Sequence, residues 1–199
     1  IKNQHLQRIH NSWESWMGGV FSCIERDGKN RETICCTVRD FTEKTFRVEM
    51  YKDYKANRDA PPDDLIPQFP LIDDLVKKMG IESYRLEGYE ADDILGTLSD
   101  QAVESGLDVV LVTSDKDLMQ LVTKKVKIFD PGKDRWFDEK GVEEKLGVKP
   151  SQVIDYLGLV GDSSDNIPGV TGIGEKTAIQ LLSEFPSLEE LYSALEAQD

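Results

Sequence analysis

The chain has 199 residues, of which 39% are hydrophobic and 31% are charged, a balance typical of a folded globular protein rather than a disordered one. Its length suffices for one domain, or for one domain with a small appendage, around a buried core. No apolar run approaches the roughly 20 residues that a membrane helix needs, and the opening residues lack the apolar stretch of a signal peptide. The three cysteines include no CxxC pair, which suits a reducing compartment. We therefore expect a cytoplasmic protein without a membrane partner.

The formal net charge is −14, from 24 Lys and Arg against 38 Asp and Glu. Taken alone, this charge argues against nucleic acid as a partner, because phosphate binding depends mostly on cations. Two features can reverse that argument. Carboxylates that bind divalent metal lose their negative field on loading, and the segment Lys44–Arg58 concentrates five basic residues against two acidic ones. Net charge alone therefore decides little.

The hydrophobic pattern predicts a buried strand at Ile34–Val38 and then a helix between Pro61 and Gly80, whose start Pro67 and Pro70 should bend or delay. An amphipathic helix, a strand, a short helix and another strand follow, respectively at Ala91–Ser105, Asp108–Thr113, Lys116–Leu121 and Val126–Phe129. Strands that alternate with helices are typical of an α/β fold with a parallel sheet. We expect this α/β core to span residues 1–137.

Beyond residue 138 the pattern changes to helices joined by Gly- and Pro-rich turns, with no strand among them. The expected helices are Val142–Leu146, Pro150–Leu159, Lys176–Glu184 and Leu188–Leu195. This pattern predicts a helical subdomain over residues 138–199.

Acidic residues gather where open α/β sheets place their sites, beyond the carboxyl ends of strands. They are Asp40 after the first strand, Glu90, Asp92 and Asp93 at the start of a helix, Asp115 and Asp117 after the next strand, and Asp162 and Asp165 in a loop of the helical part. Each group alone has a structural interpretation as a helix cap, a turn former or a surface residue.

As a set, these carboxylates indicate a metal centre. Carboxylates brought together repel strongly unless they are protonated or bridged by cations. Oxygen ligands without His or Cys select Mg²⁺ or Mn²⁺ over zinc. Two such ions roughly 3.5–4 Å apart are typical of phosphoryl transfer. The composition therefore predicts metal-dependent phosphodiester hydrolysis.

Two further elements suit phosphate. Gly169, Gly172 and Gly174 precede a helix that carries Lys176, so the backbone N–H groups there can approach a phosphate closely. A tight turn between helices is the structural alternative, whereas a helix-hairpin-helix clamp on a DNA backbone is the functional one. The second element is basic: Lys55 and Arg58 are three apart and would share a face on a helix, with a solvated face as the alternative.

Four stretches together resemble the 5′-nuclease domain of bacterial DNA polymerase I, which is related to flap endonucleases. They are FRVEMYKDYKANR, GYEADDILGTL, LVTSDKDLMQLV and DYLGLVGDSSDNIPGVTGIGEKTAIQLL. They occur in the family's order and with its spacing over about residues 38–195. The resemblance implies a PIN-like parallel-sheet core followed by a helical subdomain with a helix-three-turn-helix element.

The resemblance also implies roles for single residues. Divalent-metal ligands, direct or through water, would be Asp40, Glu90, Asp92, Asp93, Asp115 and Asp117, with Asp162 and Asp165 as an outer pair. Lys55 and Arg58 would lie at the base of a helical arch and position the scissile phosphate. DNA contacts would come from Phe46, Arg47, Tyr54, Lys55, Arg58, Gly169, Gly172, Gly174, Lys176 and Thr177, and the glycine-rich element would grip duplex DNA and hold a K⁺ ion.

The first thirty residues depart from the family, whose members open with an apolar strand ending in a metal-binding Asp followed by Gly. Here Asp27-Gly28 follows SCIER, a segment typical of a helix end, and Trp13–Glu25 is a candidate for the family's first long helix. The opening strand and its Asp would then be missing.

Three hypotheses follow. The first is a monomeric, structure-selective 5′-nuclease that acts on flaps or nicked duplex DNA in replication and repair, alone or fused to a polymerase region. The second is a DNA-binding module of the same family with an incomplete, inactive metal site. The third is an acidic metal-binding domain without a DNA role, for which duplex binding would be absent or insensitive to salt.

Overall fold

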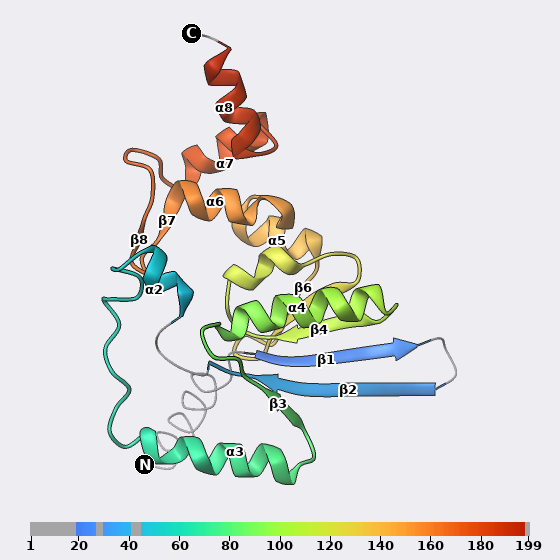
Figure 1. The fold of residues 1–199 in the computed structure, drawn as a ribbon. Helices are drawn as coiled ribbons and strands as arrows, with labels where there is room; N and C mark the ends of the chain where they lie inside the picture. The colour runs from blue at the N-terminus through green and yellow to red at the C-terminus, as the bar shows by residue number, and fades with distance from the viewer. Residues whose placement is uncertain (1–18, 27–29, 41–44, 198–199) are drawn as a thin grey trace.

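The computed structural model describes residues 19–26, 30–40 and 45–197. A six-stranded mixed sheet in the order β3-β2-β1-β4-β5-β6 forms its centre (Figure 1). The strands β2, β3, β4 and β5 run in one direction, and β1 and β6 run in the other. In chain order the strands are β1 Gly19–Arg26, β2 Asn30–Val38, β3 Glu82–Tyr84, β4 Asp108–Val112, β5 Val126–Asp130 and β6 Arg135–Phe137. The predicted α/β class is confirmed, with parallel pairs inside a mixed sheet.

The central strand β1 corrects our expectation for the start of the chain. The segment SCIER, predicted to end a helix, lies in β1, which pairs antiparallel with β2 on one side and β4 on the other. A short apolar segment fits a helix or a strand equally well, and here the two neighbouring strands decide for a strand. The helix proposed over Trp13–Glu25 is therefore wrong from Gly19 onward. Its first residues, and the pair Asp27-Gly28, lie outside the described residues.

Strand direction brings the candidate site residues to one edge of the sheet. Because β2 and β4 run the same way on either side of β1, their carboxyl ends meet at one edge. Asp40 follows β2 there, and Asp115 follows β4. The strand β1 instead brings its amino end to this edge, where Gly19 pairs with Val38. The first described residues of β1 therefore add no carboxylate at this edge.

The helix α4, Ala91–Glu104, packs on one face of the sheet against β1, β2 and β4 (Figure 1). Leu95 of this helix is fully buried, and so are Leu111 of β4 and Ile128 of β5. Burial of these side chains provides most of the driving force that holds α4 in place. The N-terminus of α4, with Glu90 and Asp92, is thereby fixed beside the carboxyl ends of β2 and β4.

Two segments before α4 frame the sheet. The short helix α2, Phe46–Met50, is followed by a turn, the 3₁₀ helix η1 at Ile66–Gln68, and α3 at Phe69–Lys78, which packs against β3. The helix predicted after Pro61 thus begins only at Phe69, which confirms the delay expected from the prolines. The short helix predicted after β4 is the 3₁₀ helix η2, Asp117–Leu121.

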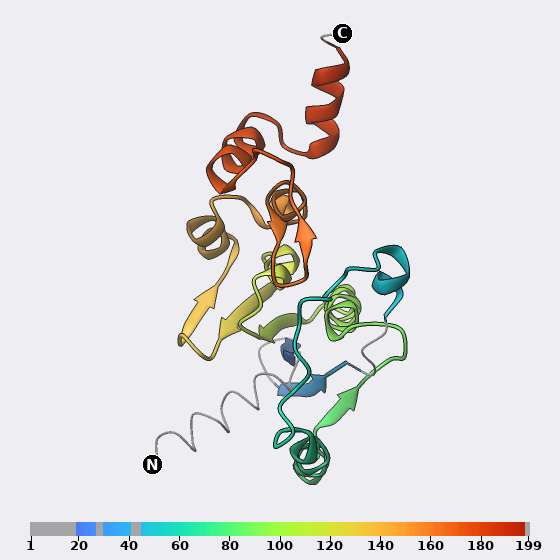
Figure 2. The ribbon, with the colours of Figure 1, turned by 90° about the vertical axis from the view of Figure 1, so that its left-hand side faces the viewer.

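The rest of the chain is mainly helical and extends away from the sheet, ending in α8 (Figures 1 and 2). Its helices are α5 Glu139–Leu146, the 3₁₀ helix η3 Pro150–Gln152, α6 Val153–Val160, α7 Glu175–Glu184 and α8 Leu188–Glu196. The expectation of no strand here is wrong, because β7, Gly161–Asp162, pairs with β8, Ile167–Pro168. Two-residue strands are too short to produce a hydrophobic period. The division at residue 137 falls between β6 and α5 and, as a domain boundary, stays a prediction.

None of the helices in the described part of the chain has the length and apolar character needed to cross a membrane.

Candidate metal centre and nucleic-acid interface

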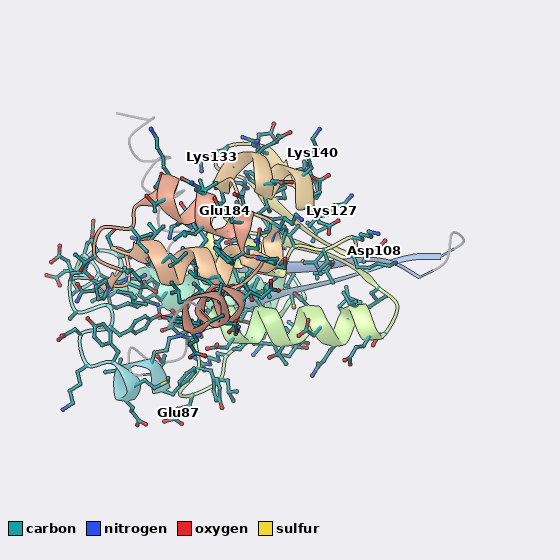
Figure 3. The ribbon with its side chains drawn as sticks, turned by 90° about the horizontal axis from the view of Figure 1, so that it is seen from above. Glu87, Asp108, Lys127, Lys133, Lys140 and Glu184 are labelled. Carbon is teal, nitrogen blue, oxygen red and sulfur yellow. The ribbon has the colours of Figure 1, made fainter. Side chains whose placement is uncertain are left out.

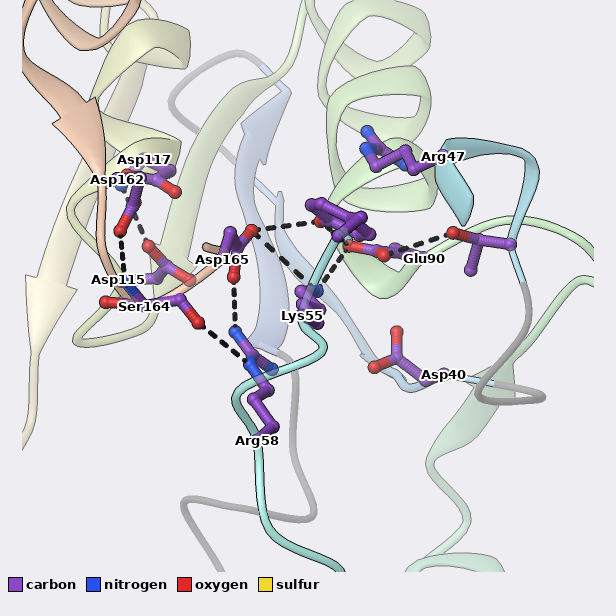
Figure 4. Close-up of polar contacts among 12 residues, drawn as sticks. Asp40, Arg47, Lys55, Arg58, Glu90, Asp115, Asp117, Asp162, Ser164 and Asp165 are labelled. Carbon is purple, nitrogen blue, oxygen red and sulfur yellow. Dashed lines mark hydrogen bonds and ion pairs between the residues drawn. The ribbon is translucent and has the colours of Figure 1, made fainter. Parts of the chain in front are cut away.

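Glu90, at the N-terminus of α4, is one of the most enclosed candidate carboxylates, with 6% of its surface exposed. Its Oε2 accepts hydrogen bonds from Lys55 Nζ at 2.7 Å and Tyr54 Oη at 3.0 Å (Figure 4). Its Oε1 accepts one from Thr45 Oγ1 at 3.2 Å. A buried carboxylate is tolerated only when donors surround it in this way. Glu90 is therefore the point where α4 meets the segment 45–58.

Asp40 and Asp92 lie in the same electrostatic environment. Asp40 Oδ1 accepts a hydrogen bond of 2.7 Å from the backbone N–H of Ala91, which joins the end of β2 to the start of α4. Burial raises the pKa of Asp92 to about 7, together with the charges of Asp115, Asp40 and Glu90. The negative charges of carboxylates from separate segments thus disfavour ionisation of Asp92, as expected for groups gathered at neighbouring strand ends.

A second half of the cluster lies around Lys116. Its Nζ donates to Asp117 Oδ1 at 3.1 Å and to Asp162 Oδ2 at 2.6 Å. Burial raises the pKa of Asp117, and the charge of Asp115 raises it further. Burial also acts to raise the pKa of Asp162, but hydrogen bonds from Lys116 and Ser164 outweigh it, so that this pKa lies below its usual value. Asp162, from the helical part, is thereby joined to the carboxylates that follow β4.

Asp93 is engaged within the protein. Arg47 Nη1 and Nη2 donate to its two carboxylate oxygens at 2.7 Å each. Asp93 Oδ2 also accepts from the backbone N–H of Glu90 at 2.9 Å, which forms a capping box at the start of α4. The hydrogen bonds from Arg47 lower the pKa of Asp93 in spite of its partial burial. Asp93 therefore has the helix-terminal role that was the structural alternative, and a ligand role stays a prediction that requires Arg47 to move away.

Turn-forming roles also occur at two other candidates. Asp115 Oδ1 accepts from the backbone N–H of Asp117 at 2.8 Å, and Asp162 Oδ1 accepts from that of Ser164 at 2.8 Å. Each contact uses one carboxylate oxygen and orients the side chain. The structural and the metal-binding interpretations therefore do not exclude each other, because a carboxylate has a second oxygen to offer.

The donor set suits a hard divalent cation. Among the described residues, no three acidic, histidine or cysteine side chains are arranged closely enough to hold a metal ion together. The candidates nevertheless offer only carboxylate oxygens, the ligands that Mg²⁺ and Mn²⁺ prefer. The ammonium groups of Lys55 and Lys116 lie among these oxygens and balance the negative charge that a bound metal ion would otherwise balance. The residues present thus fit a divalent metal by their chemistry, and loading requires these lysines to give way.

Lys55 and Arg58 lie on a turn rather than on a helix. Helix α2 ends at Met50, and Lys55 has a positive φ of 56°. Arg58 Nη2 forms an ion pair of 2.6 Å with Asp165 Oδ1, and the backbone N–H of Lys55 donates to the carbonyl oxygen of Asp165 at 2.9 Å. The helical face considered for these cations is therefore wrong. Contacts with the loop between β7 and β8 override the local spacing and still bring both cations to the carboxylates (Figure 4).

Further hydrogen bonds fasten this turn to the same loop. Asn57 Nδ2 donates to the carbonyl oxygen of Ser163 at 2.8 Å, and Asn166 Nδ2 donates to that of Asp53 at 2.7 Å. The segment from Asp53 to Arg58 is thus held against the helical part of the chain.

Tyr54 lies between two carboxylates and is only 8% exposed. Its Oη is 3.0 Å from Glu90 Oε2 and 2.9 Å from Asp165 Oδ2. Burial raises the pKa of Tyr54 far above its usual value, and the charge of Glu90 adds to the rise. Since a neutral phenol carries one proton, it can donate to only one carboxylate at a time. Tyr54 was predicted to contact DNA, but its hydroxyl connects the carboxylates, and a DNA contact stays a prediction.

A cleft of about 550 Å³ opens beside the cluster. Phe46, Arg47 and Met50 line one side, Ile154 of α6 lines another, and Asp92 lies among its lining residues. Phe46 is 39% exposed and carries the Arg47 guanidinium 4.7 Å above its ring. An aromatic and cationic wall beside carboxylates suits a nucleotide chain, whose bases stack and whose phosphates need cations.

The three glycines predicted to contact DNA differ in their surroundings. A Cβ at Gly169 would collide with the backbone of Val160, so this glycine permits close packing of the loop after β8. Gly172 has a φ of 86°, which favours glycine, and a Cβ at Gly174 would meet nothing within 4 Å. Lys176 and Thr177 are exposed in the first turn of α7. The backbone around Gly172 and Gly174 is thus the part open to a phosphate.

Sequence reasoning missed Lys116 and Asp130 as contributors to the site. Lys116 stands between two predicted ligands, and this position was a signal that a cation would lie among them. Asp130 is 1% exposed and accepts a hydrogen bond of 2.8 Å from the hydroxyl of Ser114, which precedes Asp115. A lone Asp at the end of a strand gave no such signal.

Further basic side chains are exposed beyond the cluster, and one of them, Lys133, forms an ion pair with Asp130. Lys127, Lys133 and Lys140 are on β5, the turn after it and α5, on the opposite side of the molecule from Glu87 (Figure 3). Asp108 and Glu184 lie on the same side as these lysines, so acidic and basic side chains are mixed there (Figure 3).

Two family models match the chain: the 5′-3′ exonuclease N-terminal resolvase-like domain over residues 11–147, and the 5′-3′ exonuclease C-terminal SAM fold over residues 148–199. The chain is 46% identical over 171 residues to a DNA polymerase I of Rhizobium leguminosarum, a match that covers 83% of the chain and 17% of the polymerase. It is 41% identical over 177 residues to a 5′-3′ exonuclease of Buchnera aphidicola, with 89% of the chain and 62% of the relative covered.

A solved structure of the bacteriophage T5 flap endonuclease, in a pseudo-enzyme–product complex with DNA and metal ions, resembles the fold with a TM-score of 0.69 at 27% identity. That match covers 77% of this chain and 61% of the T5 chain. The chain spans less than two thirds of each of these three proteins. Two adjoining family matches, on a sheet and a helical region of the expected kinds, leave one conclusion: the chain belongs to the 5′-3′ exonuclease family.

Proposed function

We propose that this chain is a divalent-metal-dependent 5′-3′ exonuclease and structure-selective flap endonuclease that hydrolyses DNA phosphodiester bonds. The observation that carries the proposal is geometric: Glu90, Asp92 and Asp117 line one cleft, and Asp40 bonds to the first residue of the helix that begins beside them. Such a cluster is costly to maintain in a fold unless cations occupy it. A DNA clamp without catalysis would not need it.

In this proposal the carboxylates hold two ions, which are Mg²⁺ or Mn²⁺. When bound, the ions supply an activated water and stabilise the leaving oxygen. The charge of Asp115 acts on both Asp92 and Asp117, so we assign these three residues to hold the ions with Glu90 and Asp40. Asp162 and Asp165 complete the set of metal ligands from the helical side as its outer pair.

The cations of the turn act on the substrate. Lys55 and Arg58 exchange their carboxylate partners for the oxygens of the scissile phosphate, where they stabilise the charge that develops during cleavage. Arg47 and Phe46 line the path of the strand through the cleft. Gly172 and Gly174 let the backbone approach a phosphate of the duplex.

We extend the proposal to the setting of the enzyme. Lys176 and Thr177 complete the duplex grip, which holds a K⁺ ion, and the protein acts as a monomer on 5′ flaps or nicked duplex during replication and repair. It acts alone, as the Buchnera aphidicola relative named a 5′-3′ exonuclease suggests, or fused to a polymerase region, as the polymerase I relative suggests. Cys35 is a free thiol, which suits the cytoplasm.

The test is cleavage of a labelled 5′-flap DNA with Mg²⁺ or Mn²⁺, by the chain as given and by an Asp115→Ala, Asp117→Ala double variant. Metal-dependent cutting that the double variant loses supports the proposal. Flap binding without cutting would overturn it and leave the inactive DNA-binding module as the function. Absence of both binding and cutting would contradict both.

A further inference from the structure

Lys116 forms the most direct polar link between the carboxylates after β4 and the helical part of the chain. Its Nζ is 2.6 Å from Asp162 Oδ2 and 3.1 Å from Asp117 Oδ1, so that one ammonium bridges two carboxylates. The Asp162 side chain is only 9% exposed, whereas that of Lys116 is 41% exposed. The lysine therefore reaches inward from the surface to an enclosed carboxylate and can withdraw without opening the core.

The surroundings explain why a cation is needed there. The charges of Asp115 and Asp162 both act on Asp117. The other oxygen of Asp162 accepts from the backbone N–H of Ser164, which fixes the direction of the side chain. Without Lys116, the charges of Asp117 and Asp162 would repel each other, and no other cation in the described part of the chain bonds to both. An ammonium bridge stabilises this arrangement, and it uses the oxygens that a divalent ion would use.

We propose that Lys116 is a tethered competitor of one of the two divalent ions and thereby sets the affinity of the subsite between Asp117 and Asp162. This inference rests on the proposed metal centre and adds the regulation of one half of it. At low metal concentration the ammonium fills the subsite. Loading requires Lys116 to leave both oxygens, so the ion at this subsite binds more weakly than it would to the carboxylates alone.

Competition of this kind has a definite signature. A side chain that occupies the site in the metal-free protein raises the apparent dissociation constant of the incoming ion. The factor is set by the ratio of the population with the site occupied to the population with the site open. Neutralising Lys116 removes that factor at one subsite only. The subsite near Glu90, Asp92 and Asp40 keeps its affinity, because the ammonium of Lys116 bonds to Asp117 and Asp162 instead.

The test measures Mn²⁺ binding to the chain as given, by electron paramagnetic resonance of free Mn²⁺ and by calorimetry, without DNA. Lys116→Met is compared with Lys124→Met, which removes the same charge from an exposed position in a nearby loop. We expect Lys116→Met to lower the weaker of two dissociation constants by about tenfold, and Lys124→Met to leave both unchanged. The thermal midpoint of Lys116→Met should also rise more steeply with Mn²⁺ than that of the original chain.

The outcomes separate the inference from the proposed function. An unchanged or raised weaker constant in Lys116→Met, with the original chain binding two ions, overturns the inference and leaves the metal centre intact. No Mn²⁺ binding in any variant overturns both. Lys116→Gln repeats the measurement with a polar side chain, so that a folding defect of the Met variant cannot mask the result, and it should show the same gain.

Discussion

Arg47 and Asp93 form a two-pronged ion pair, with two hydrogen bonds of 2.7 Å between the guanidinium of α2 and the carboxylate at the start of α4. The pair attaches the beginning of the segment that carries Lys55 to the helix that carries Glu90 and Asp92. Because a planar guanidinium forms two parallel hydrogen bonds with a carboxylate, the pair fixes the relative orientation of the two side chains as well as attracting them. The orientation of α2 over the cleft therefore depends on it.

Arg47→Lys should lower the free energy of unfolding by about 1 kcal/mol, because lysine keeps the charge and loses the fork on a partly exposed pair. Arg47→Met should cost slightly more. Urea unfolding of both variants, of Asp93→Asn and of the combined variant measures the coupling between the two residues. Lys52→Met, at an exposed position of the same segment, is the matched control. Additive effects of Arg47→Met and Asp93→Asn would contradict the pairing.

The metal-free protein should become less stable as pH rises from about 4 to about 7. The fold raises the pKa of Asp92 to about 7, whereas the pKa of an Asp in an unfolded chain is about 4. Between these values the folded state binds more protons than the unfolded state, so stability falls with increasing pH.

Asp92→Asn should reduce this fall, to which the raised pKa of Asp117 also contributes, and should stabilise the metal-free protein at pH 8 by about 1–3 kcal/mol more than at pH 5. Unfolding in urea with a chelator at both values of pH gives the difference. Asp100→Asn, at an exposed position on the same helix, should show no such dependence. An equal effect of Asp92→Asn at both values would rule out a charged neighbourhood around Asp92.

Asp130 should be among the most costly carboxylates to remove. It is 1% exposed and accepts from Ser114 Oγ at 2.8 Å, from Lys133 Nζ at 3.0 Å, and from the backbone N–H groups of Gly132 and Lys133. Asp130→Ala leaves these donors without their acceptor and should cost about 3 kcal/mol of unfolding free energy. Glu143→Ala, at an exposed position of α5, should change it by less than about 0.5 kcal/mol.

The same residue predicts acid sensitivity. Burial opposes the charge on Asp130, but hydrogen bonds from Lys133 and Ser114 outweigh it and lower its pKa. A lowered carboxyl pKa stabilises the fold above the unfolded value of about 4, and this contribution disappears as pH falls through the folded pKa. Acid titration followed by circular dichroism should show Lys133→Met unfolding at a higher pH than the original chain. Coincident curves would contradict this account.

Replacement by alanine should have different effects on stability at two glycines near α7. Gly169→Ala forces a Cβ into the backbone of Val160 and should lower the thermal midpoint by several degrees, with about 2 kcal/mol lost. Gly174→Ala meets nothing within 4 Å, and its φ is −99°, so the fold should keep its stability. If Gly174 approaches a phosphate, duplex binding measured by anisotropy should nevertheless weaken. Unaltered binding by Gly174→Ala would remove this position from the DNA interface.

The parts of the fold with strong periodicity could be predicted. The strand around Val109 and Leu111 and the helix around Leu95 bury one face each, and the pattern of apolar residues reports that burial directly. The carboxylates beside them followed from strand ends. By contrast, β1 could not be predicted, because a short apolar segment becomes a strand only through its neighbours.

The contacts of the site depended on residues far apart in the sequence. Tyr54 bonds to Asp165, and Lys116 to Asp162, across separations that no local pattern encodes. The glycine pattern around Gly169 did indicate a tight turn, but only the packing against Val160 explains that position. Chemical types could thus be inferred from the sequence, whereas partners required the folded chain.

The hydrogen bonds between the Asp53–Arg58 turn and the loop around Ser163–Asn166 bear on how this chain can be recombined with its relatives. The two family matches meet between residues 147 and 148, which makes that junction an inviting crossover point for chimeras. A chimera joined there would inherit Asn57 and Arg58 from one parent and Asn166 and Asp165 from the other. The two parts therefore cannot be exchanged independently between relatives. A functional chimera needs the turn at Asp53–Arg58 and the loop at Ser163–Asn166 from the same parent.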